Sequence, residues 1–322
     1  MAKTRQRTAK RTLCSLIGLL ALSLLPACDE NDVSPPVAPT QVYTVSGDGR
    51  ITVYWNDYPE IYSDDISGYR IWSRYYQVGD EDDPARDFFV IGEVAVRDNY
   101  DADWGQYHYV DTDVENGVDY EYAVTAVSPH GESYRSFEIV IDTPLPMSES
   151  PLTIFDVAGP NHHLAGFDFS LAAEHGAYDD NGAAGLVDPT VGGTTADVRV
   201  RFDTAGIPWL ETMRADVHVQ DYGTFLDGNN QLDFAGVSWA PEFGWSESGV
   251  LELIVGHIYV VEIYNEPDSG DIHYAKLGVA SVDGNARFAR IMWAYQSVNG
   301  LPELAAPQSR GGGDDGTRPI SL

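Results

Sequence analysis

The sequence predicts an all-β protein of two domains, and three observations support that fold class. Its 31 glycines and 18 prolines separate short runs of β-branched and aromatic residues, a spacing typical of strands joined by turns. Many of these runs alternate apolar and polar residues, so that each strand has one buried and one solvated face. No segment of ten or more residues within 152–304 has a convincing helical period. The roughly 295 residues that follow residue 27 are enough for two such domains.

The chain begins with the three parts of a secretory signal peptide. Residues 1–11 carry five basic side chains and no acid, and a nearly unbroken apolar run of about 14 residues follows, ending at Leu25. That run is too short to cross a bilayer, which takes roughly 20 residues. Leu25, Ala27 and Cys28 resemble the cleavage site of bacterial lipoproteins, with the intervening proline as a mild departure. We expect residues 1–27 to be removed as a lipoprotein signal peptide.

The lipoprotein resemblance implies that acyl chains on Cys28 anchor the protein to a membrane. Each buried CH₂ group contributes ~0.8 kcal/mol, so that two or more chains hold a protein stably where one does not. The implied location is the cell envelope, with the outer membrane or cell surface favoured over the inner membrane. Residues 28–38 are acidic and contain prolines, and we expect them to form an extended tether that reaches roughly 30 Å.

The composition excludes nucleic acid as a partner. The chain has 19 basic and 50 acidic residues, and the 14 basic and 50 acidic residues beyond residue 27 give the mature chain a formal charge of −36. Phosphate binding needs clustered Lys and Arg, which these numbers disfavour. Cys14 lies in the signal segment, so that Cys28 would be the only cysteine left. We therefore expect no intramolecular disulfide and, with Cys28 acylated, no thiol catalysis.

Residues 39–144 contain about seven short strands separated by turn signals. Four stretches have apolar, glycine and tyrosine residues at the spacings of known strands and turns. They are Ala38-Pro39 with Val42, Ile51-Val53-Trp55, Ile66-Gly68-Tyr69-Ile71 and 116–127. This segment resembles a fibronectin type III domain, which is an immunoglobulin-like sandwich. The match covers essentially the whole segment, and an acidic insertion at 79–84 is its main departure.

The fibronectin resemblance implies structural roles for two residues. Trp55 takes the place of the core tryptophan, and Tyr120 takes the place of the tyrosine-corner residue, whose hydroxyl bonds to backbone a few residues upstream. The carboxylates of the insertion at 79–84 are oxygen ligands that suit Ca²⁺, but they lack the spacing of a calcium loop, and we interpret them as solvated. The resemblance implies a spacer or binding module rather than an enzyme.

A proline-containing linker at 145–151 leads to residues 152–304, which we expect to form a larger antiparallel β-domain. Its expected strands are apolar or alternating runs at 164–170, 196–202, 215–220, 251–263, 274–282 and 288–296. An Asp-Gly pair beginning at Asp283 predicts a hairpin between the last two strands. Residues 208–214 are interpreted as one helical turn. The glycine-rich residues 305–322 are expected to be a disordered tail.

The second domain contains two histidines that are candidate ligands for haem or a transition metal. His257 and His273 lie in or beside expected strands, and neutral imidazole ligates both kinds of centre. The strand-forming runs around them are 256–261, 273–277 and 291–296, with 167–170 upstream. These runs resemble the haem-carrying lipoproteins of the HmuY type. The resemblance implies the fold of the domain more than its ligand. The alternative to a ligand role is that each histidine is an ordinary surface or core residue.

Two further candidate sites lie in the same domain. Asp227, Asn229 and Asp233 offer oxygens at spaced positions that suit Ca²⁺, although runs rich in Asn and Gly also simply form hairpin loops. Trp239 and Trp245 flank an expected loop, where exposed indole rings would stack on the sugar rings of a glycan. Packing of both tryptophans in a core is the alternative.

The sequence contains no hydrolase elbow, no zinc-protease helix and no phosphate-binding glycine loop. We therefore predict a membrane-anchored, non-catalytic module of the cell envelope that serves in binding, adhesion or assembly. The first domain would be a spacer, and residues 152–304 would carry the partner surface. A haem carrier and a carbohydrate-binding lipoprotein are the alternatives. Expected partners are the membrane, through acylated Cys28, and a protein or glycan; haem or calcium would be cofactors only in the alternatives.

Overall fold

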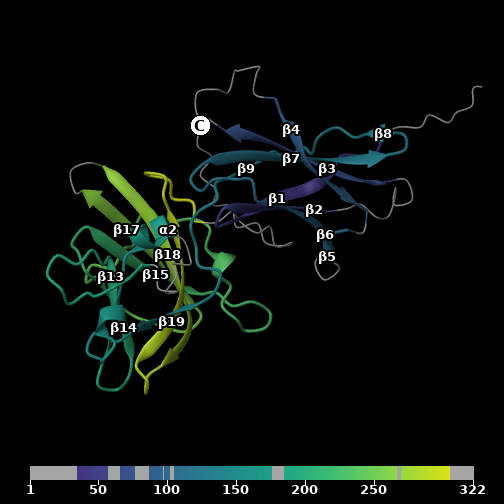
Figure 1. The fold of residues 1–322 in the computed structure, drawn as a ribbon. Helices are drawn as coiled ribbons and strands as arrows, with labels where there is room; N and C mark the ends of the chain where they lie inside the picture. The colour runs from purple at the N-terminus through teal and green to yellow at the C-terminus, as the bar shows by residue number, and fades with distance from the viewer. Residues whose placement is uncertain are drawn as a thin grey trace, which may run out of the picture. The chain divides into compact units, whose positions relative to one another are not determined.

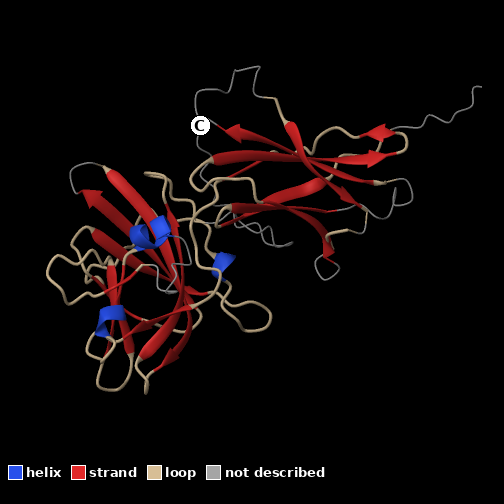
Figure 2. Ribbon diagram, in the orientation of Figure 1, coloured by secondary structure: helices blue, strands red, loops and turns tan. Residues whose placement is uncertain are grey.

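The computed structural model describes residues 35–56, 66–76, 87–96, 98–101, 105–175, 185–266 and 270–304. Cys28 with the expected signal peptide, the acidic insertion at 79–84 and the expected tail at 305–322 lie outside the described residues. Strands dominate the described chain, and every strand pairing is antiparallel (Figures 1 and 2). The all-β prediction is confirmed.

The first sandwich is built from two sheets. Sheet 1 has the order β1-β2-β6-β5, and sheet 2 has the order β4-β3-β7-β8, with β9 also paired to β7. The strands of sheet 1 are β1 (Thr40–Gly47), β2 (Arg50–Asn56), β5 (Tyr100–Asp101) and β6 (Gln106–Asp111). The strands of sheet 2 are β3 (Gly68–Tyr76), β4 (Phe89–Ala95), β7 (Asp119–Ser128), β8 (Gly131–Glu132) and β9 (Val140–Asp142).

An aromatic cluster fills the core of this sandwich. β2 alternates buried and partly buried residues, which turns Ile51, Val53 and Trp55 inward. The Trp55 ring lies 5.4 Å from the Tyr69 ring of sheet 2 and 5.9 Å from the Tyr107 ring of its own sheet, measured between centroids. Each large ring at the centre buries much apolar area, which matters in a domain whose sequence has no cysteine to form a disulfide.

The second sandwich is also built from two sheets of five strands each. Sheet 3 has the order β10-β19-β18-β17-β15, and sheet 4 has the order β12-β11-β13-β14-β16. The strands of sheet 3 are β10 (Leu152–Phe155), β15 (Val217–Thr224), β17 (His257–Glu266), β18 (Asp271–Asp283) and β19 (Phe288–Gln296). The strands of sheet 4 are β11 (Gly166–Phe167), β12 (Leu186–Val187), β13 (Val198–Phe202), β14 (Pro208–Thr212) and β16 (Val250–Glu252).

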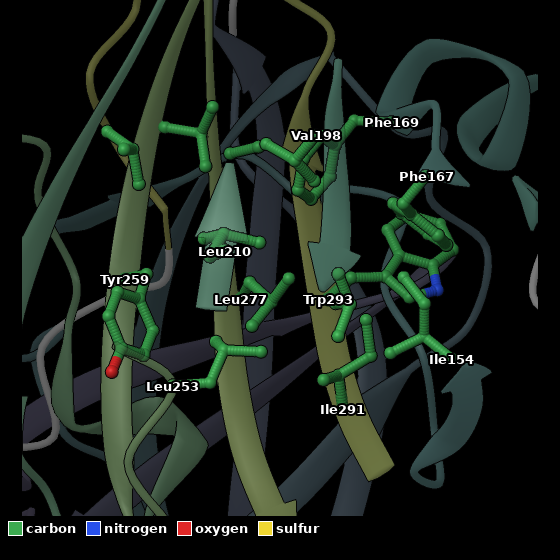
Figure 3. Packing of buried hydrophobic residues seen from close by; sticks show 14 of the residues in the cluster. Ile154, Phe167, Phe169, Val198, Leu210, Leu253, Tyr259, Leu277, Ile291 and Trp293 are labelled. Atoms are coloured by element: carbon green, nitrogen blue, oxygen red, sulfur yellow. The ribbon is translucent and has the colours of Figure 1, made fainter. Parts of the chain in front are cut away.

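The main core of the second sandwich lies between sheets 3 and 4. In β13 the apolar residues Val198, Val200 and Phe202 are buried, and the arginines between them are partly exposed. Figure 3 shows part of this cluster, in which the Trp293 ring of β19 lies 5.8 Å from the Phe167 ring of β11. Alternation in each strand therefore places one apolar face of each sheet against the other.

Three local expectations for this domain were wrong. The predicted single strand at 251–263 is two strands, β16 in sheet 4 and β17 in sheet 3. The predicted strand at 164–170 is a strand only at β11, because helix α2 (Phe169–His175) begins directly after it. Asp168 starts that helix: its Oδ1 accepts the Leu171 N–H at 2.9 Å, which satisfies a donor that the first turn leaves free. The expected helical turn at 208–214 is instead β14, which pairs with β13 on one side and β16 on the other.

The second face of sheet 3 is covered as well. We call residues 225–249, which connect β15 to β16, the strap. The strap contains the short helix η2 (Phe234–Gly236) and buries Phe234, Val237 and Ala240 against Ile258 and Val260 of β17 and Ala294 of β19. Leu145 and Leu304 complete this smaller cluster. Met147 in the expected linker pairs with Ala294, so that this part of the chain lies along β19.

Candidate binding surface

The most exposed apolar side chains among the described residues of the first domain follow β8. Tyr134 and Phe137 are 93% and 96% exposed, and Ile139 and Ile141 are also exposed. We call these four residues the apolar edge. Single exposed apolar residues are ordinary, but adjacent ones on a soluble domain mark contact surfaces. Two nearly fully solvated rings within four residues are therefore a candidate binding surface.

Two serines explain why these side chains point outward. The Ser133 and Ser136 hydroxyls accept the N–H groups of Ala126 and Val124 on β7, at 2.9 and 3.1 Å. The N–H groups of the two serines donate to the carbonyl oxygens of the same two β7 residues. Because side-chain oxygens replace backbone carbonyls as acceptors, the segment stays attached to β7 without forming a continuous strand. The residues between and after the serines are turned toward solvent.

Beside the apolar edge, two arginines sandwich a phenylalanine. The guanidinium carbons of Arg74 and Arg135 lie 4.4 and 4.6 Å from the centre of the Phe88 ring. Arg74 also forms an ion pair of 2.6 Å with the buried Glu121 of β7. Arginine and aromatic residues are the types that dominate binding energy at protein interfaces. This surface therefore has the composition of an interaction site in a chain whose formal charge is −31.

The two residues carried over from the fibronectin resemblance lie in the first core. Trp55 is fully buried. The Tyr120 hydroxyl accepts the backbone N–H of Glu115 at 2.9 Å, five residues upstream. Gly117 lies between them with φ of +81°, a conformation that L side chains rarely adopt. This arrangement is the geometry of a tyrosine corner.

The structure does not bring the two candidate haem ligands together. His257 begins β17, and His273 pairs with Ile263 near the other end of that strand. His257 and Ile263 are six residues apart in β17, so that the two histidines are separated by roughly 20 Å along the strand direction. The His257 Nδ1 lies 3.0 Å from a carboxylate oxygen of Asp221. His273 has partners at both ring nitrogens, the Gln296 carbonyl oxygen at 3.0 Å and Asp271 at 3.2 Å.

The candidate calcium residues lie in the first turn of the strap. The Asp227 Oδ1 accepts the N–H groups of Asn229 and Gln231, at 2.9 and 2.8 Å. This oxygen therefore closes the turn, which is the structural role that aspartate often has in loops. Asp233 lies at the start of η2. The described ranges of the chain hold no group of three or more His, Cys, Asp or Glu side chains arranged to bind a metal ion.

The two candidate glycan-stacking tryptophans differ in their surroundings. Trp239 is 40% exposed and pairs with Glu303. Trp245 is partly buried and packs against the cluster beneath the strap. Phe243, between them, is 80% exposed. The strap thus presents Phe243 and part of Trp239 to solvent, while Trp245 contributes to packing.

Sequence reasoning missed Lys276 of β18. This side chain is fully buried beneath the strap, and burial lowers its pKa to about 7. A signal was available in the sequence, because Lys276 is the only lysine beyond residue 10.

Among the described residues, none of the helices has the length and hydropathy that a membrane span requires.

Comparisons with known proteins add likenesses of low identity. No family model matches the chain, and no curated protein matches it. A solved structure described as a myokine is 23% identical over 34% of this chain and 99% of its own, with a TM-score of 0.25. A fibronectin type III-like protein from Clostridium thermocellum is 23% identical over 34% of this chain and 92% of its own, with a TM-score of 0.24. Domains FN1–FN3 of chicken CNTN1 are 10% identical over 81% of this chain and 68% of their own, with a TM-score of 0.28.

The strand order itself identifies the architecture of the first domain. Sheet 1 pairs the first, second and sixth strands, and sheet 2 pairs the fourth, third and seventh strands, with the last strand added beside the seventh. This order is the one that immunoglobulin-like sandwiches share, and the tyrosine corner lies at its usual corner before the seventh strand. The first domain is a fibronectin type III-like sandwich.

Proposed function

We propose that this protein is a non-catalytic binding or assembly module, held at a cell-envelope membrane by acyl chains on Cys28. The fibronectin type III-like domain would contact a protein partner through the apolar edge. The observation that carries the proposal is the exposure of Tyr134 and Phe137, which leaves two aromatic rings in water at one edge of sheet 2. The first domain would then be more than a spacer.

The energetics favour a partner at this surface. An aromatic side chain covers roughly 150–250 Å² when it is buried. At about 25 cal/mol per Å², each ring would contribute roughly 4–6 kcal/mol of gross stabilisation. Association itself costs about 4–15 kcal/mol in lost freedom. Two rings and two isoleucines are therefore enough to offset much of that cost, and the Arg74–Phe88–Arg135 stack extends the same surface.

The test compares matched exposed phenylalanines. In membranes solubilised with mild detergent, we expect the full chain and Phe243→Ser to migrate in one complex larger than the chain itself on native gels. Phe137→Ser combined with Tyr134→Ser removes the two rings, and we expect it to migrate as the single chain. Thermal unfolding of both variants serves as the folding control. An unchanged complex in the double variant would remove the apolar edge from the proposal.

Membrane attachment has a separate test. Cys28→Ser removes the atom that would carry the acyl chains, and we expect the variant to be released from washed membranes without detergent. The wild-type chain should stay with the membranes until detergent is added, because two or more acyl chains hold stably. Retention of Cys28→Ser in the membrane fraction would contradict lipid anchoring.

A glycan is the second candidate partner, favoured by the exposure of Phe243 and Trp239 on the strap. Stacking on sugar rings needs solvent access to a ring face. Iodide should quench part of the tryptophan fluorescence in the wild-type chain and less of it in Trp239→Phe. A soluble glycan that binds the strap would protect Trp239 from iodide, and a panel of glycans without protection would exclude this candidate. The separation of His257 from His273 gives the haem alternative no comparable support.

A further inference from the structure

Lys276 is the only lysine beyond residue 10, where the other residues of strongly basic type are all arginines. It lies in the middle of the outer face of sheet 3, where Val260 of β17 and Ala294 of β19 are its neighbours across the sheet. Both neighbours are fully buried, as is Lys276 itself. Among the described residues, lysine therefore occupies the position at which a Lys or Arg side chain is fully buried.

Both hydrogen-bond acceptors of the Lys276 amine belong to the strap. Nζ donates to the carbonyl oxygen of Phe234 at 2.9 Å and to that of Val237 at 2.8 Å, one at each end of η2. Nζ also lies 4.6 Å from the centre of the Phe234 ring. No ion pair to Lys276 is present among the described residues. The amine thus joins sheet to strap through two neutral acceptors.

The strap also lies very close to the sheet beside Lys276. A Cβ placed on Gly278 would lie 2.7 Å from Leu232 Cδ2 and 2.8 Å from Phe234 Cδ2. Only glycine leaves room for the strap at this point. The close approach excludes water from the lysine. Burial outweighs the attraction of Asp233, so that the uncharged amine is the form of lower free energy here.

The choice of lysine over arginine follows from this environment. A guanidinium group stays charged at all pH values that a protein survives, whereas an amine can lose its proton when it is buried. An uncharged amine has two N–H bonds, and the strap offers two carbonyl oxygens. Burial lowers the pKa of Lys276 to about 7. A protonated amine would have to be accommodated among apolar side chains or gain access to water.

We propose that Lys276 is a proton-operated latch that holds the strap on sheet 3. In the closed state the uncharged amine bonds to the Phe234 and Val237 carbonyl groups. When the strap lifts, the amine reaches water and takes up one proton. Falling pH therefore favours the lifted strap, which uncovers the apolar residues of β17 and β19 and releases the segment that carries Trp239 and Phe243.

Other ionisable groups line the same face and have to be separated from Lys276. Asp233 of the strap favours the charged amine. On the next level of the sheet, His218 of β15 bonds to Glu262 of β17, which pairs with Tyr274 of β18. Glu303 pairs with Trp239 of the strap. A measurement that reads Lys276 alone, or a variant at an apolar strap residue, leaves all of these ionisable groups unsubstituted.

The test is the pH dependence of acylation at Lys276 in the purified full chain. Sulfo-N-hydroxysuccinimide acetate reacts only with an uncharged amine in water, and peptide mass spectrometry reads Lys276 by itself. As pH falls from about 10 to 7, the population of the lifted state rises tenfold per pH unit. Over the same range the uncharged fraction of the lifted amine falls tenfold per unit. The two effects cancel. The rate should stay level down to about pH 7 and then fall tenfold per unit.

The same lysine in the urea-unfolded chain is the reference. Its rate should fall tenfold per unit from about pH 10 downward, because a solvated lysine has a pKa near 10.4. A folded-state profile with its midpoint near pH 7 supports the latch. A folded-state profile with its midpoint near pH 10 would show that the closed strap tolerates the charged amine, and would overturn the proposal.

A pair of valine variants distinguishes lifting of the strap from unfolding of the domain. Val237→Ala weakens only the cluster beneath the strap, and we expect it to raise the acylation rate by roughly tenfold. Val198→Ala removes the same methyl groups from the core between sheets 3 and 4, and we expect it to leave the rate unchanged. Equal acceleration by both variants would mean that Lys276 is reached only by global unfolding, which would refute the latch.

Discussion

Asp142 ends β9 with its side chain fully enclosed in the first sandwich. The Ser46 hydroxyl donates a hydrogen bond of 2.5 Å to one of its carboxylate oxygens, but no arginine or lysine pairs with it among the described residues. Burial therefore dominates and raises the pKa of Asp142 to about 6. The folded domain keeps this proton to a higher pH than the unfolded chain, whose carboxyl group has its ordinary pKa of 3.8.

The sign of the resulting pH dependence follows from that difference. The folded state binds more protons between pH 4 and 6, so that stability falls as pH rises through this window. The loss amounts to about 3 kcal/mol of the free energy of unfolding, because each pKa unit is worth 1.36 kcal/mol. Asp142→Asn has no ionisable group at this position. As pH rises from 4 to 7, we therefore expect the unfolding free energy of the wild type to fall relative to that of the variant. Urea unfolding at several pH values measures this gap, and a constant gap would contradict the assignment.

At the scale of elements, one end of the second sandwich is closed by two loops that meet at glycines. The turn between β13 and β14 contains Gly206, and the hairpin between β18 and β19 contains Gly284. The Arg287 side chain fastens the same hairpin: it donates to the carbonyl oxygens of Phe202 and Asp203, and its Nε lies 2.6 Å from Asp156. The loops of the two sheets are therefore joined by one arginine and by close backbone packing.

Gly284→Ala should open this junction. A Cβ at this position would lie 2.6 Å from the Gly206 carbonyl oxygen, a backbone atom that cannot move aside without shifting its loop. We expect a loss of about 1–3 kcal/mol in the unfolding free energy of the second domain. Gly192→Ala is the matched control, because nothing lies within 4 Å of its added Cβ. Thermal unfolding compares the two, and equal melting temperatures for both variants would contradict the contact.

For the whole molecule, local pattern was a good guide to strands and a poor guide to what faces solvent. Alternation in β13 and the Asp-Gly pair before Asn285 predicted a strand and a hairpin correctly, because both depend on neighbouring residues. The start of α2 was missed, since a single capping aspartate at Asp168 ends a strand-like run. The burial of Lys276 depends on a strap some 40 residues away in the chain, and no local pattern records that contact.

The apolar edge illustrates the same limit at the candidate site. The segment after β8 contains Tyr134, Phe137, Ile139 and Ile141, and no local sequence pattern predicted that these side chains are exposed. Its rings face water because Ser133 and Ser136 occupy the N–H groups of β7. Recognising that exchange requires knowing which strand lies opposite. The histidines pose the same problem, since strand parity places His257 and His273 on one face without giving their separation along it.

The two serine hydroxyls have one more consequence. Edge strands with a regular row of free backbone groups act as templates on which further chains assemble into cross-β fibrils. Between β8 and β9 that row is interrupted, because side-chain oxygens take the place of carbonyl groups at two positions. An incoming chain finds aromatic rings here but no evenly spaced ladder of donors and acceptors. The irregular pairing of this segment with β7 thus disfavours the growth of a cross-β ladder beside the exposed Phe137.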